Sequence, residues 1–362
     1  MSHRILASLA FLVSSAVVAL AGGPTQEPLH VLSPVVHGNL VIFPVVGGTN
    51  YDTSRFLTLD EGLHSGSVIV TEKGSLQGLV RRGRPVAQYS SAEVNQLVLV
   101  NNSDRPLLLL AGEIVTGGKQ DRVIGADRLV PAKSDPIDLS VFCVEPGRWV
   151  ERSQQFGSLK SQMAQPSVRV PAMAGHNQQE VWNRVAGARK AIIVASNAPD
   201  ALMATTSSYA TTMAAPQVQT KINTVAANYD GVVNDLRKTG AKGVVVAING
   251  QLVWADLFAS NDLLLRYWEK LVRSYAAESL IEVNEKKSVD LKLAQAFLDH
   301  MTGNREVIET ESGIFRRAEI TGDGYRVFSL TALLPKTDFD LHVAKMTYEK
   351  EAVMKPWNGM LR

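Results

Sequence analysis

The stretch LLLLAGEIVTGGKQDRVIGADRLVPA, residues 107–132, decides how the first half of the chain folds. Its apolar run with glycines and a lysine resembles a phosphate-binding loop, which requires G-x-x-x-x-G-K-[ST] between a strand and a helix. The spacing fails, because 112–118 puts one residue too many before Lys119. Gln120 also replaces the hydroxyl that would bind magnesium. Because Pro131 and the lack of helical spacing exclude a following helix, no helix N-terminus is present to bind phosphate. The pattern predicts a strand, a tight turn and a strand.

Three strands are predicted in this region, at 107–116, 122–131 and 137–144, joined as an antiparallel meander. The first and third strands of a meander run in the same direction. The turn 117–121 and the segment 145–149 should therefore emerge at the same end of the sheet, although they are distant in sequence. Both segments are polar, and we expect them to form one cluster.

The predicted cluster has the composition of a binding site for a small anionic or hydrogen-bonding ligand. Glu-Pro-Gly-Arg at 145–148 fits a type II turn, in which the carboxylate and the guanidinium can face each other. Glu145 is a candidate catalytic residue. The ligand-binding candidates from the two turns are Lys119, Gln120, Arg122, Arg148 and Trp149. The alternative is a rim of surface charges around two tight turns.

Two other residues of these strands have alternative interpretations. Glu113, the second catalytic candidate, lies in an otherwise apolar strand. On a buried face it needs a partner such as Lys119 or Arg122, whereas on an edge strand it would face solvent. Cys143 is the only cysteine, so no intramolecular disulfide can form. It is in phase with Val141, which favours a small core residue over a reactive thiolate.

The first 21 residues are predicted to be a signal peptide. Arg4 supplies a positive charge, residues 5–18 are apolar apart from serines, and residues 19–21, Ala-Leu-Ala, fit the cleavage rule. The chain is therefore expected to be exported, to the periplasm or outside the cell, with no membrane partner after cleavage. The alternative is an N-terminal membrane anchor, for which the apolar run is short compared with the ~20 residues of a span.

The composition is that of an ordinary globular protein. The formal net charge of +2 falls to about +1 after cleavage, too near neutrality to predict nucleic acid as a partner. The basic run 81–84 is interpreted as a solvated turn in preference to an anion-binding patch. Scattered histidines and the lack of paired-ligand spacing predict no metal site. Nothing in the sequence specifies a cofactor or an oligomeric state.

The chain is predicted to be α+β, with antiparallel strands towards both ends and a helical middle. Residues 22–150 form a β-rich half with one short helix, which begins in a capping box at Thr58. Residues 151–240 contain helices predicted at 177–195 and 218–236. The Ser/Thr/Ala-rich stretch between them, 205–216, is expected to be flexible or an exposed helical turn.

Residues 241–345 are predicted to be an α+β half, followed by a tail at 346–362. Asn249-Gly250 lies between two apolar runs and predicts a type I′ hairpin, because both residues tolerate a positive φ. Helices are expected from Asn261 and Ser288, and a further hairpin at 323–324. The pattern is compatible with one domain or with two.

The same motifs carry a family resemblance. The run 112–122, the segment Cys-Val-Glu-Pro-Gly-Arg-Trp at 143–149 and the pattern Gln-x-x-Val-Trp at 178–182 are similar to those of a domain family associated with ADP-ribosylglycohydrolases and rhodanese-phosphatases. This sequence departs from the family pattern at Ile114, Asp121 and Phe142. The resemblance adds Gln178 and Trp182 to the ligand-binding candidates. It implies a functional cluster at the sheet end and no particular reaction.

The predicted function is binding of a small polar or anionic ligand, for example a nucleotide or an ADP-ribose-like molecule. If the chain is an enzyme, a hydrolase or transferase with Glu113 or Glu145 as general base fits best. The alternative is a non-catalytic envelope scaffold or interaction module. In that case the same residues form a buried polar network that pins the sheet to the helix at 177–195.

Overall fold

The computed structural model describes residues 28–73, 96–148, 150–198, 207–281 and 287–348. The predicted signal peptide, the basic run 81–84 and Trp149 lie outside the described residues. The fold is α+β, as predicted, with antiparallel sheets at both ends of the chain and helices mainly between them.

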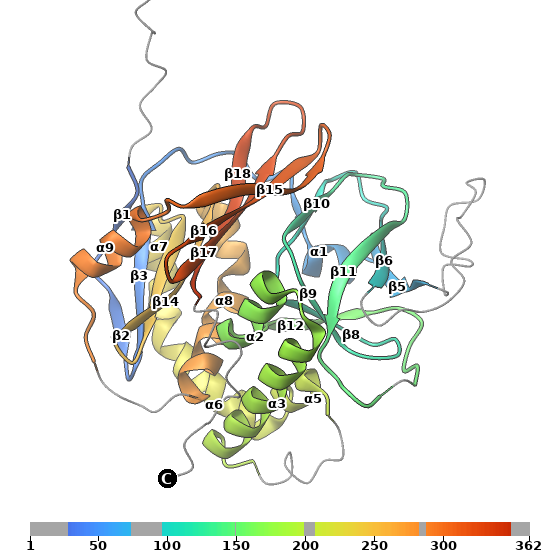
Figure 1. Cartoon of the computed structure of the whole chain (residues 1–362), viewed down its shortest axis with the longest axis horizontal. Helices are drawn as coiled ribbons and strands as arrows, with labels where there is room; N and C mark the ends of the chain where they lie inside the picture. Colours follow the sequence, from blue (N-terminus) through green and yellow to red (C-terminus); the bar gives the residue numbers. More distant parts are fainter. Residues whose placement is uncertain (1–27, 74–95, 149, 199–206, 282–286, 349–362) are drawn as a thin grey trace, which may run out of the picture.

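A nine-stranded antiparallel sheet collects strands from both ends of the chain (Figure 1). Its order is β1-β3-β13-β14-β18-β17-β16-β15, and β2 also pairs with β3. The N-terminal strands therefore share a sheet with the C-terminal half, and the β-rich half 22–150 is divided between sheets. The strands are β1 (His30–Val31), β2 (Val35–His37), β3 (Leu40–Val46), β13 (Gly243–Ile248), β14 (Gln251–Phe258), β15 (Asn304–Glu311), β16 (Phe315–Gly322), β17 (Tyr325–Ala332) and β18 (Phe339–Thr347).

The remaining described strands form a small β lobe beside the large sheet (Figure 1). One of its sheets has the order β12-β8-β9-β11-β6-β5, and the other has the order β10-β7-β4. The strands are β4 (Leu57–Thr58), β5 (Val68–Glu72), β6 (Gln96–Asn101), β7 (Leu107–Leu109), β8 (Glu113–Thr116), β9 (Arg122–Ile124), β10 (Arg128–Val130), β11 (Ile137–Cys143) and β12 (Gly157–Met163).

The predicted meander is present, since β9 pairs antiparallel with both β8 and β11. The two strands expected at 107–116 and 122–131 are each broken, however, and the hairpin continues as β7–β10 in the other sheet. The break occurs at Gly112, whose φ is +95° and whose added Cβ would lie 2.7 Å from the Arg169 side chain. Only glycine fits there without strain. The resulting bend brings Asp127 to the large sheet.

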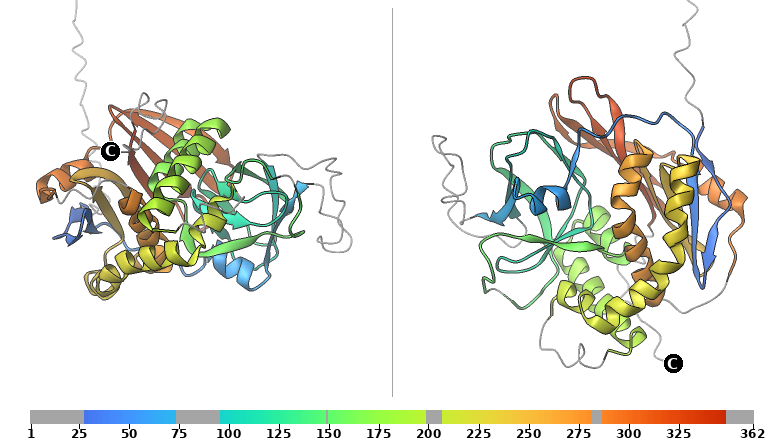
Figure 2. Two further views of the ribbon diagram at one scale, coloured as in Figure 1. Left: turned by 90° about the horizontal axis from the view of Figure 1, so that it is seen from below. Right: turned by 180° about the vertical axis from the view of Figure 1, so that it is seen from behind.

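The helices pack in several places around the two β parts, and the right-hand view of Figure 2 shows α7 and α8 lying along the large sheet from behind. The helices are α1 (Leu59–His64), α2 (Pro166–Val170), the π-helix η2 (Pro171–Gly175), α3 (Gln178–Ala195), α5 (Tyr209–Met213), α6 (Pro216–Ala226), the 3-10 helix η3 (Ala227–Tyr229), α7 (Asp230–Thr239), α8 (Asn261–Ile281) and α9 (Leu291–Asp299). None of the helices in the described ranges is long and apolar enough to cross a membrane.

Local signals placed several of these elements correctly. Thr58 forms the predicted capping box with Glu61, and Asn177 caps α3. Asn249 and Gly250 have φ of 53° and 78°, as a type I′ hairpin requires. The helix expected at 218–236 is instead two helices, α6 and α7, with the turn η3 between them. β18 also runs on to Thr347, into the segment predicted as tail.

The described part of the Ser/Thr/Ala-rich stretch, 207–216, forms a helical turn, as one of the two alternatives predicted, but only Thr211, Ala214 and Pro216 of its residues are exposed. It contains α5, in which Tyr209, Ala210, Thr212 and Met213 are buried. The Tyr209 hydroxyl donates a hydrogen bond to the Gln165 side chain at 3.1 Å. Tyr209, Ala210 and Met213 are apolar, and their burial holds this helical turn against the body of the protein.

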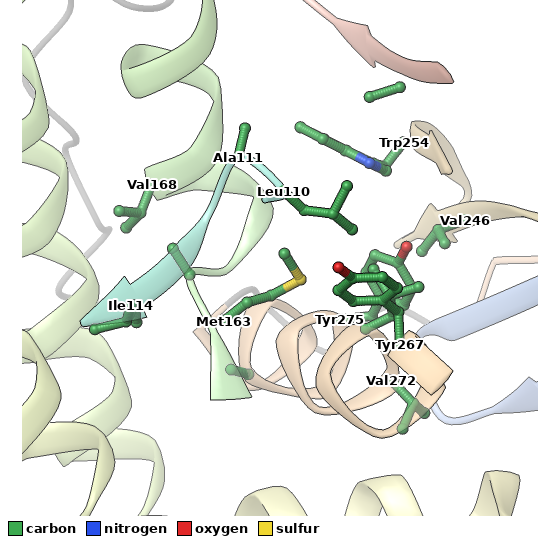
Figure 3. Packing of buried hydrophobic residues seen from close by; sticks show 14 of the residues in the cluster. Leu110, Ala111, Ile114, Met163, Val168, Val246, Trp254, Tyr267, Val272 and Tyr275 are labelled. Carbon is green, nitrogen blue, oxygen red and sulfur yellow. The ribbon is translucent and has the colours of Figure 1, made fainter. Parts of the chain in front are cut away.

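One hydrophobic core joins the lobe, the helices and the large sheet. Figure 3 shows Leu110 of the bent hairpin among Met163 of β12, Trp254 of β14 and the rings of Tyr267 and Tyr275 from α8. All five side chains are at most 1% exposed. The bent hairpin is therefore held by apolar burial on the side that faces the large sheet.

Candidate functional site

The two polar turns lie at the same end of the small-lobe sheet, as the meander geometry predicted. Arg148 connects them: its Nη1 donates to the Gly118 carbonyl at 3.0 Å, and its Nη2 donates to the Gly117 carbonyl at 3.4 Å. Gln120 Nε2 donates to the Glu145 carbonyl at 3.1 Å. We call the turn 117–121 together with the segment 145–152 the rim.

Glu145 is the buried centre of the rim, with only 1% of its surface exposed. Its carboxylate pairs with Arg148 at 2.6 Å and with Arg152 at 3.4 Å, and it accepts the Asp121 amide at 3.2 Å. The predicted facing of Glu145 and Arg148 across their turn is confirmed, and Gly147 has the positive φ, 93°, of a type II turn. Because both oxygens of Glu145 are engaged, the carboxylate has little capacity left to accept a proton from a substrate.

The glycines of the first turn are explained by packing and not by a phosphate. Gly118 has φ of +48°, and an added Cβ would lie 2.2 Å from the Phe156 ring and 2.6 Å from the Glu72 carboxylate. The Lys119 amide donates to that carboxylate at 2.7 Å. The chain then continues directly into β9, so the turn has no helix behind it, as predicted.

Gly118→Ala is expected to destabilise the protein by about 3 kcal/mol, because it adds a steric clash to a left-handed backbone. Gly66→Ala is the matched control. Gly66 also has a positive φ, +68°, but an added Cβ would meet nothing within 4 Å. The control should cost only about 1 kcal/mol. Urea unfolding of the two variants measures the difference, and equal losses would show that the packing around Gly118 is not constraining.

A pocket of about 290 Å³ opens beside the rim. Asp121 and Arg152 from the rim line it together with Thr211 of α5. The Arg152 side chain is 50% exposed, so a cation is available at the pocket mouth. The remaining lining residues are Thr116, Gly117, Leu159, Ala210 and Ala214.

Asp121 is the acidic group of this pocket, and the sequence analysis did not include it among the candidates. Its Oδ2 accepts a hydrogen bond from the Ser208 hydroxyl at 2.7 Å, and its Oδ1 lies 3.7 Å from Arg148 Nη2. Burial raises the pKa of this carboxyl, the Ser208 bond lowers it and the neighbouring Glu145 raises it again. The net pKa lies above the ordinary value, which suits a group that exchanges protons.

Cys143 is a core residue and not an exposed thiolate. It is buried, and burial raises the pKa of its thiol despite opposing effects from the Glu145 amide, Arg122 and Trp182. Gln178 of α3 bonds to both the amide and the carbonyl of Cys143, each at 2.9 Å. These bonds fix α3 to β11, and they occupy the Gln178 amide that was a ligand-binding candidate.

Glu113 is buried, but the partners expected for it were wrong. Its carboxylate pairs with Lys270 of α8 at 2.6 Å and accepts the Leu110 amide at 2.9 Å, while Asp60 lies 2.9 Å from the same ammonium. Burial lowers the pKa of Lys270, but the two carboxylates raise it more, so the ammonium stays charged. Glu113 starts β8, at the opposite end of the strand from the rim turn. It ties the lobe to α8 and does not reach the rim.

A second polar network, which the motifs did not predict, is buried between the lobe and the large sheet. Asp256 of β14 accepts both Nη atoms of Arg169 at 3.2 Å, His342 Nε2 at 3.1 Å and the Tyr275 hydroxyl. The other nitrogen, His342 Nδ1, lies 2.5 Å from Asp127. We call Asp127, Arg169, Asp256, Tyr275 and His342 the buried charge network. Each residue is at most 3% exposed, so the network is closed to substrate.

The opposite charges in this network offset the free-energy cost of burying them. Two carboxylates face two cations, and the Arg169 guanidinium also stacks on the Trp254 ring at 4.2 Å. Burial lowers the pKa of His342, but Asp127 and Asp256 raise it to about 9, so the imidazolium donates from both nitrogens. The only sequence signal was single charged residues inside apolar runs, such as Asp256 in LVWADLF.

Comparison with known families agrees with the motifs that build the rim. A family model described as the ARG and Rhodanese-Phosphatase-superfamily-associated Protein domain, ARPP-1, matches residues 28–344. The chain belongs to the ARPP-1 family. No curated protein and no solved structure matches it. The match spans both the small lobe and the large sheet, so the ARPP-1 domain includes the rim and the buried charge network together.

The structure thus brings together most of the candidates proposed for this ARPP-1 domain. The candidates located at the rim or directly beneath it are Lys119, Gln120, Arg122, Glu145 and Arg148. Gln178 and the half-buried Trp182 lie behind them on α3, next to Cys143. Glu113 lies elsewhere, and Trp149 is outside the described residues.

Proposed function

We propose that this ARPP-1 domain is an exported protein that binds a small anionic ligand in the rim pocket. Arg152 would pair with a phosphate or carboxylate of the ligand, and Asp121 would accept a hydrogen bond from a hydroxyl. Sugar phosphates, nucleotides and ADP-ribose-like molecules combine these two groups. The observation that carries the proposal is the pocket itself, which is lined by a half-exposed arginine and by a carboxyl whose pKa is raised.

Unsatisfied polar atoms beneath the pocket support the proposal. In native proteins most buried polar atoms have a hydrogen-bond partner, so each exception needs an explanation. Five buried atoms without a hydrogen-bond partner belong to rim residues or to their neighbours Glu72 and Arg122: Glu72 Oε2, Gln120 Oε1, Arg122 Nε and Nη2, and Arg148 Nε. A ligand or a water chain that enters from the pocket would meet this need. An arginine cluster with spare donors also suits an anion.

If the domain catalyses a reaction, Asp121 is the carboxylate that lines the rim pocket, and its oxygens also accept hydrogen bonds from the Gly117 amide and the Ser208 hydroxyl. Glu145 is saturated by two arginines and an amide, and Glu113 is paired with Lys270. Asp121 lines the pocket and has a raised pKa. The arrangement favours hydrolysis or group transfer on a bound phosphate ester or glycoside.

A scaffold function is the second candidate, and a specific observation favours it. The bonds of Arg148, Gln120 and Gln178 that the structure records all end on backbone or carboxylate groups of the protein itself. Such a network fixes two turns and α3 in one arrangement without any ligand. In that case the rim would be a stability element of an envelope module.

A thermal-shift screen with nucleotides, ADP-ribose and sugar phosphates distinguishes the two candidates. A ligand at about 100 times its Kd stabilises the folded state by about 2.7 kcal/mol, which raises the melting temperature by roughly 4 °C. Arg152→Ala should abolish this shift. The apo protein should lose less than about 1 kcal/mol, because the side chain is half-exposed and its ion pair is screened.

Lys133→Ala is the matched control, since Lys133 is an exposed cation paired with Asp104 away from the pocket. It should leave the ligand-induced shift unchanged. If no compound stabilises the wild type while Arg148→Ala unfolds it, the scaffold function is correct. Retention of the full shift in Arg152→Ala would place the ligand somewhere other than the rim pocket.

A further inference from the structure

A second and larger pocket, of about 410 Å³, lies on the large sheet. Val45, Leu257 and Val343 line it, and the same three residues pack in the cluster beneath α9. The pocket therefore opens on the face of the sheet that carries α9, and it shares no residue with the rim pocket. Its volume is in the range that holds small organic ligands.

Lys242 provides an unusual charge at one end of this pocket. The residue is only 8% exposed, and its ammonium donates to the Thr49 carbonyl at 2.6 Å. Within the described ranges no carboxylate lies within 4.0 Å of Nζ, and burial alone lowers the pKa of the group. The ammonium carries a full charge and three donors. Lys270 pairs with Glu113, whereas Lys242 has no such carboxylate among the described residues.

A glycine lies directly beside the Lys242 ammonium. Gly48 has φ of +64°, and an added Cβ would lie 2.9 Å from Nζ. A larger residue at this position would crowd the ammonium on the pocket side. Aromatic surface lies along the same pocket, where the Tyr51 and Phe339 rings stack with centroids 4.1 Å apart and both line the wall.

The other end of the pocket is polar. Arg316, Thr331 and Asp340 are neighbours across β16, β17 and β18, and the Thr331 hydroxyl donates to Asp340 at 2.6 Å. Arg316 Nε is buried without a hydrogen-bond partner. Asp338 also lines this end. Lys242 precedes β13 and Arg316 lies on β16, which is four strands away in the sheet order. The spacing between strands separates their backbones by roughly 19 Å, so the two cations define an elongated site.

We propose that this pocket is a second binding site, for an aromatic organic anion. The anionic group, a phosphate monoester or a carboxylate, pairs with the Lys242 ammonium. The ring packs against the Tyr51–Phe339 stack, and polar substituents reach Arg316 and Asp340. The site is independent of the rim pocket and of the function proposed for it.

Phenyl phosphate is the probe, and isothermal titration calorimetry on the full chain measures its binding. We expect one saturable site, and phenol, which keeps the ring but lacks the anion, should bind at least tenfold more weakly. Lys242→Gln should weaken phenyl phosphate binding by about tenfold or more, because it removes a charge-assisted hydrogen bond. Lys238→Gln, at an exposed lysine of α7, is the matched control and should bind as the wild type does.

Phe339→Ala and Arg152→Ala complete the test. Phe339 is half-buried at the pocket wall, so its variant should fold and still bind severalfold more weakly, which keeps the test valid if Lys242→Gln does not fold. Arg152→Ala removes the cation of the rim pocket, and the phenyl phosphate binding that depends on Lys242 should persist in this variant. The proposal is overturned if phenyl phosphate binding does not saturate by ~10 mM, because the dissociation constant would then lie above the mM range of weak ligands. It is also overturned if phenol binds equally well, or if only Arg152→Ala reduces the affinity.

Discussion

Asp256→Ala is expected to lower the free energy of unfolding by about 4 kcal/mol. Asp256 accepts four hydrogen bonds, two of them from Arg169, and is fully buried. Removing one partner of a buried ion pair leaves an uncompensated charge, which typically costs ~3–5 kcal/mol. In this variant Asp127 would be the only carboxylate of the buried charge network left to balance the charges of Arg169 and His342. Because domains are stable by about 5–15 kcal/mol, much of the total would be lost.

Two further variants show whether the buried charge of Asp256 is the cause of this loss of stability. Asp256→Asn keeps the shape of the side chain and loses its charge, so its loss should be smaller than that of the alanine variant. Asp104→Ala removes an aspartate whose side chain is 82% exposed and should change stability by less than about 0.5 kcal/mol. Denaturant unfolding measures all three. A loss below about 1 kcal/mol for Asp256→Ala would show that the buried charge network does not hold the lobe to the sheet.

The second large effect is a loss of stability at alkaline pH that depends on His342. The pKa of His342 in the folded protein is raised to about 9, against 6.5 in the unfolded chain. A raised folded-state pKa means that the stabilisation is fully present below pH 6.5 and is lost as the pH rises through 9. Since one pKa unit corresponds to ~1.4 kcal/mol, the contribution is roughly 3 kcal/mol.

His342→Gln provides the reference for this measurement, because it removes the titrating imidazole. Unfolding free energies of both proteins are measured from pH 6 to pH 10, and their difference cancels the contribution of other groups. The wild-type advantage should shrink across the interval between the two pKa values. A difference that stays constant with pH would mean that folding does not raise the pKa of His342.

Features set by neighbouring residues could be predicted from the sequence. The capping box of Thr58, the cap at Asn177 and the Asn249-Gly250 hairpin depend on interactions within a few residues. The closeness of the two rim turns could also be predicted from the sequence, because the first and third strands of a meander run in the same direction and end at the same edge of the sheet. Glu145 and Arg148 are three positions apart, so their pairing was a local property of one turn.

Features that depend on distant partners could not be predicted. Lys270 is 157 residues from Glu113, and His342 is 215 residues from Asp127. Nothing near a buried charge in the sequence names the partner that tertiary folding supplies. Strand β12, Gly-Ser-Leu-Lys-Ser-Gln-Met, lacks the β-branched and aromatic residues that mark strands, and it forms because β8 offers an edge. The pocket beside the rim needs both β12 and α5, so it could not be found from the motifs alone.

Hydrogen–deuterium exchange measures whether a ligand occupies the rim pocket. The full chain is compared with and without saturating ADP-ribose, and then with each other compound of the screen. We expect one of them to slow amide exchange in two places, residues 116–121, which include the rim turn, and the α5 region 207–214, and to leave α9 unchanged. Unchanged exchange in both segments with every compound, or protection only elsewhere, would contradict the proposal that the rim pocket binds a ligand.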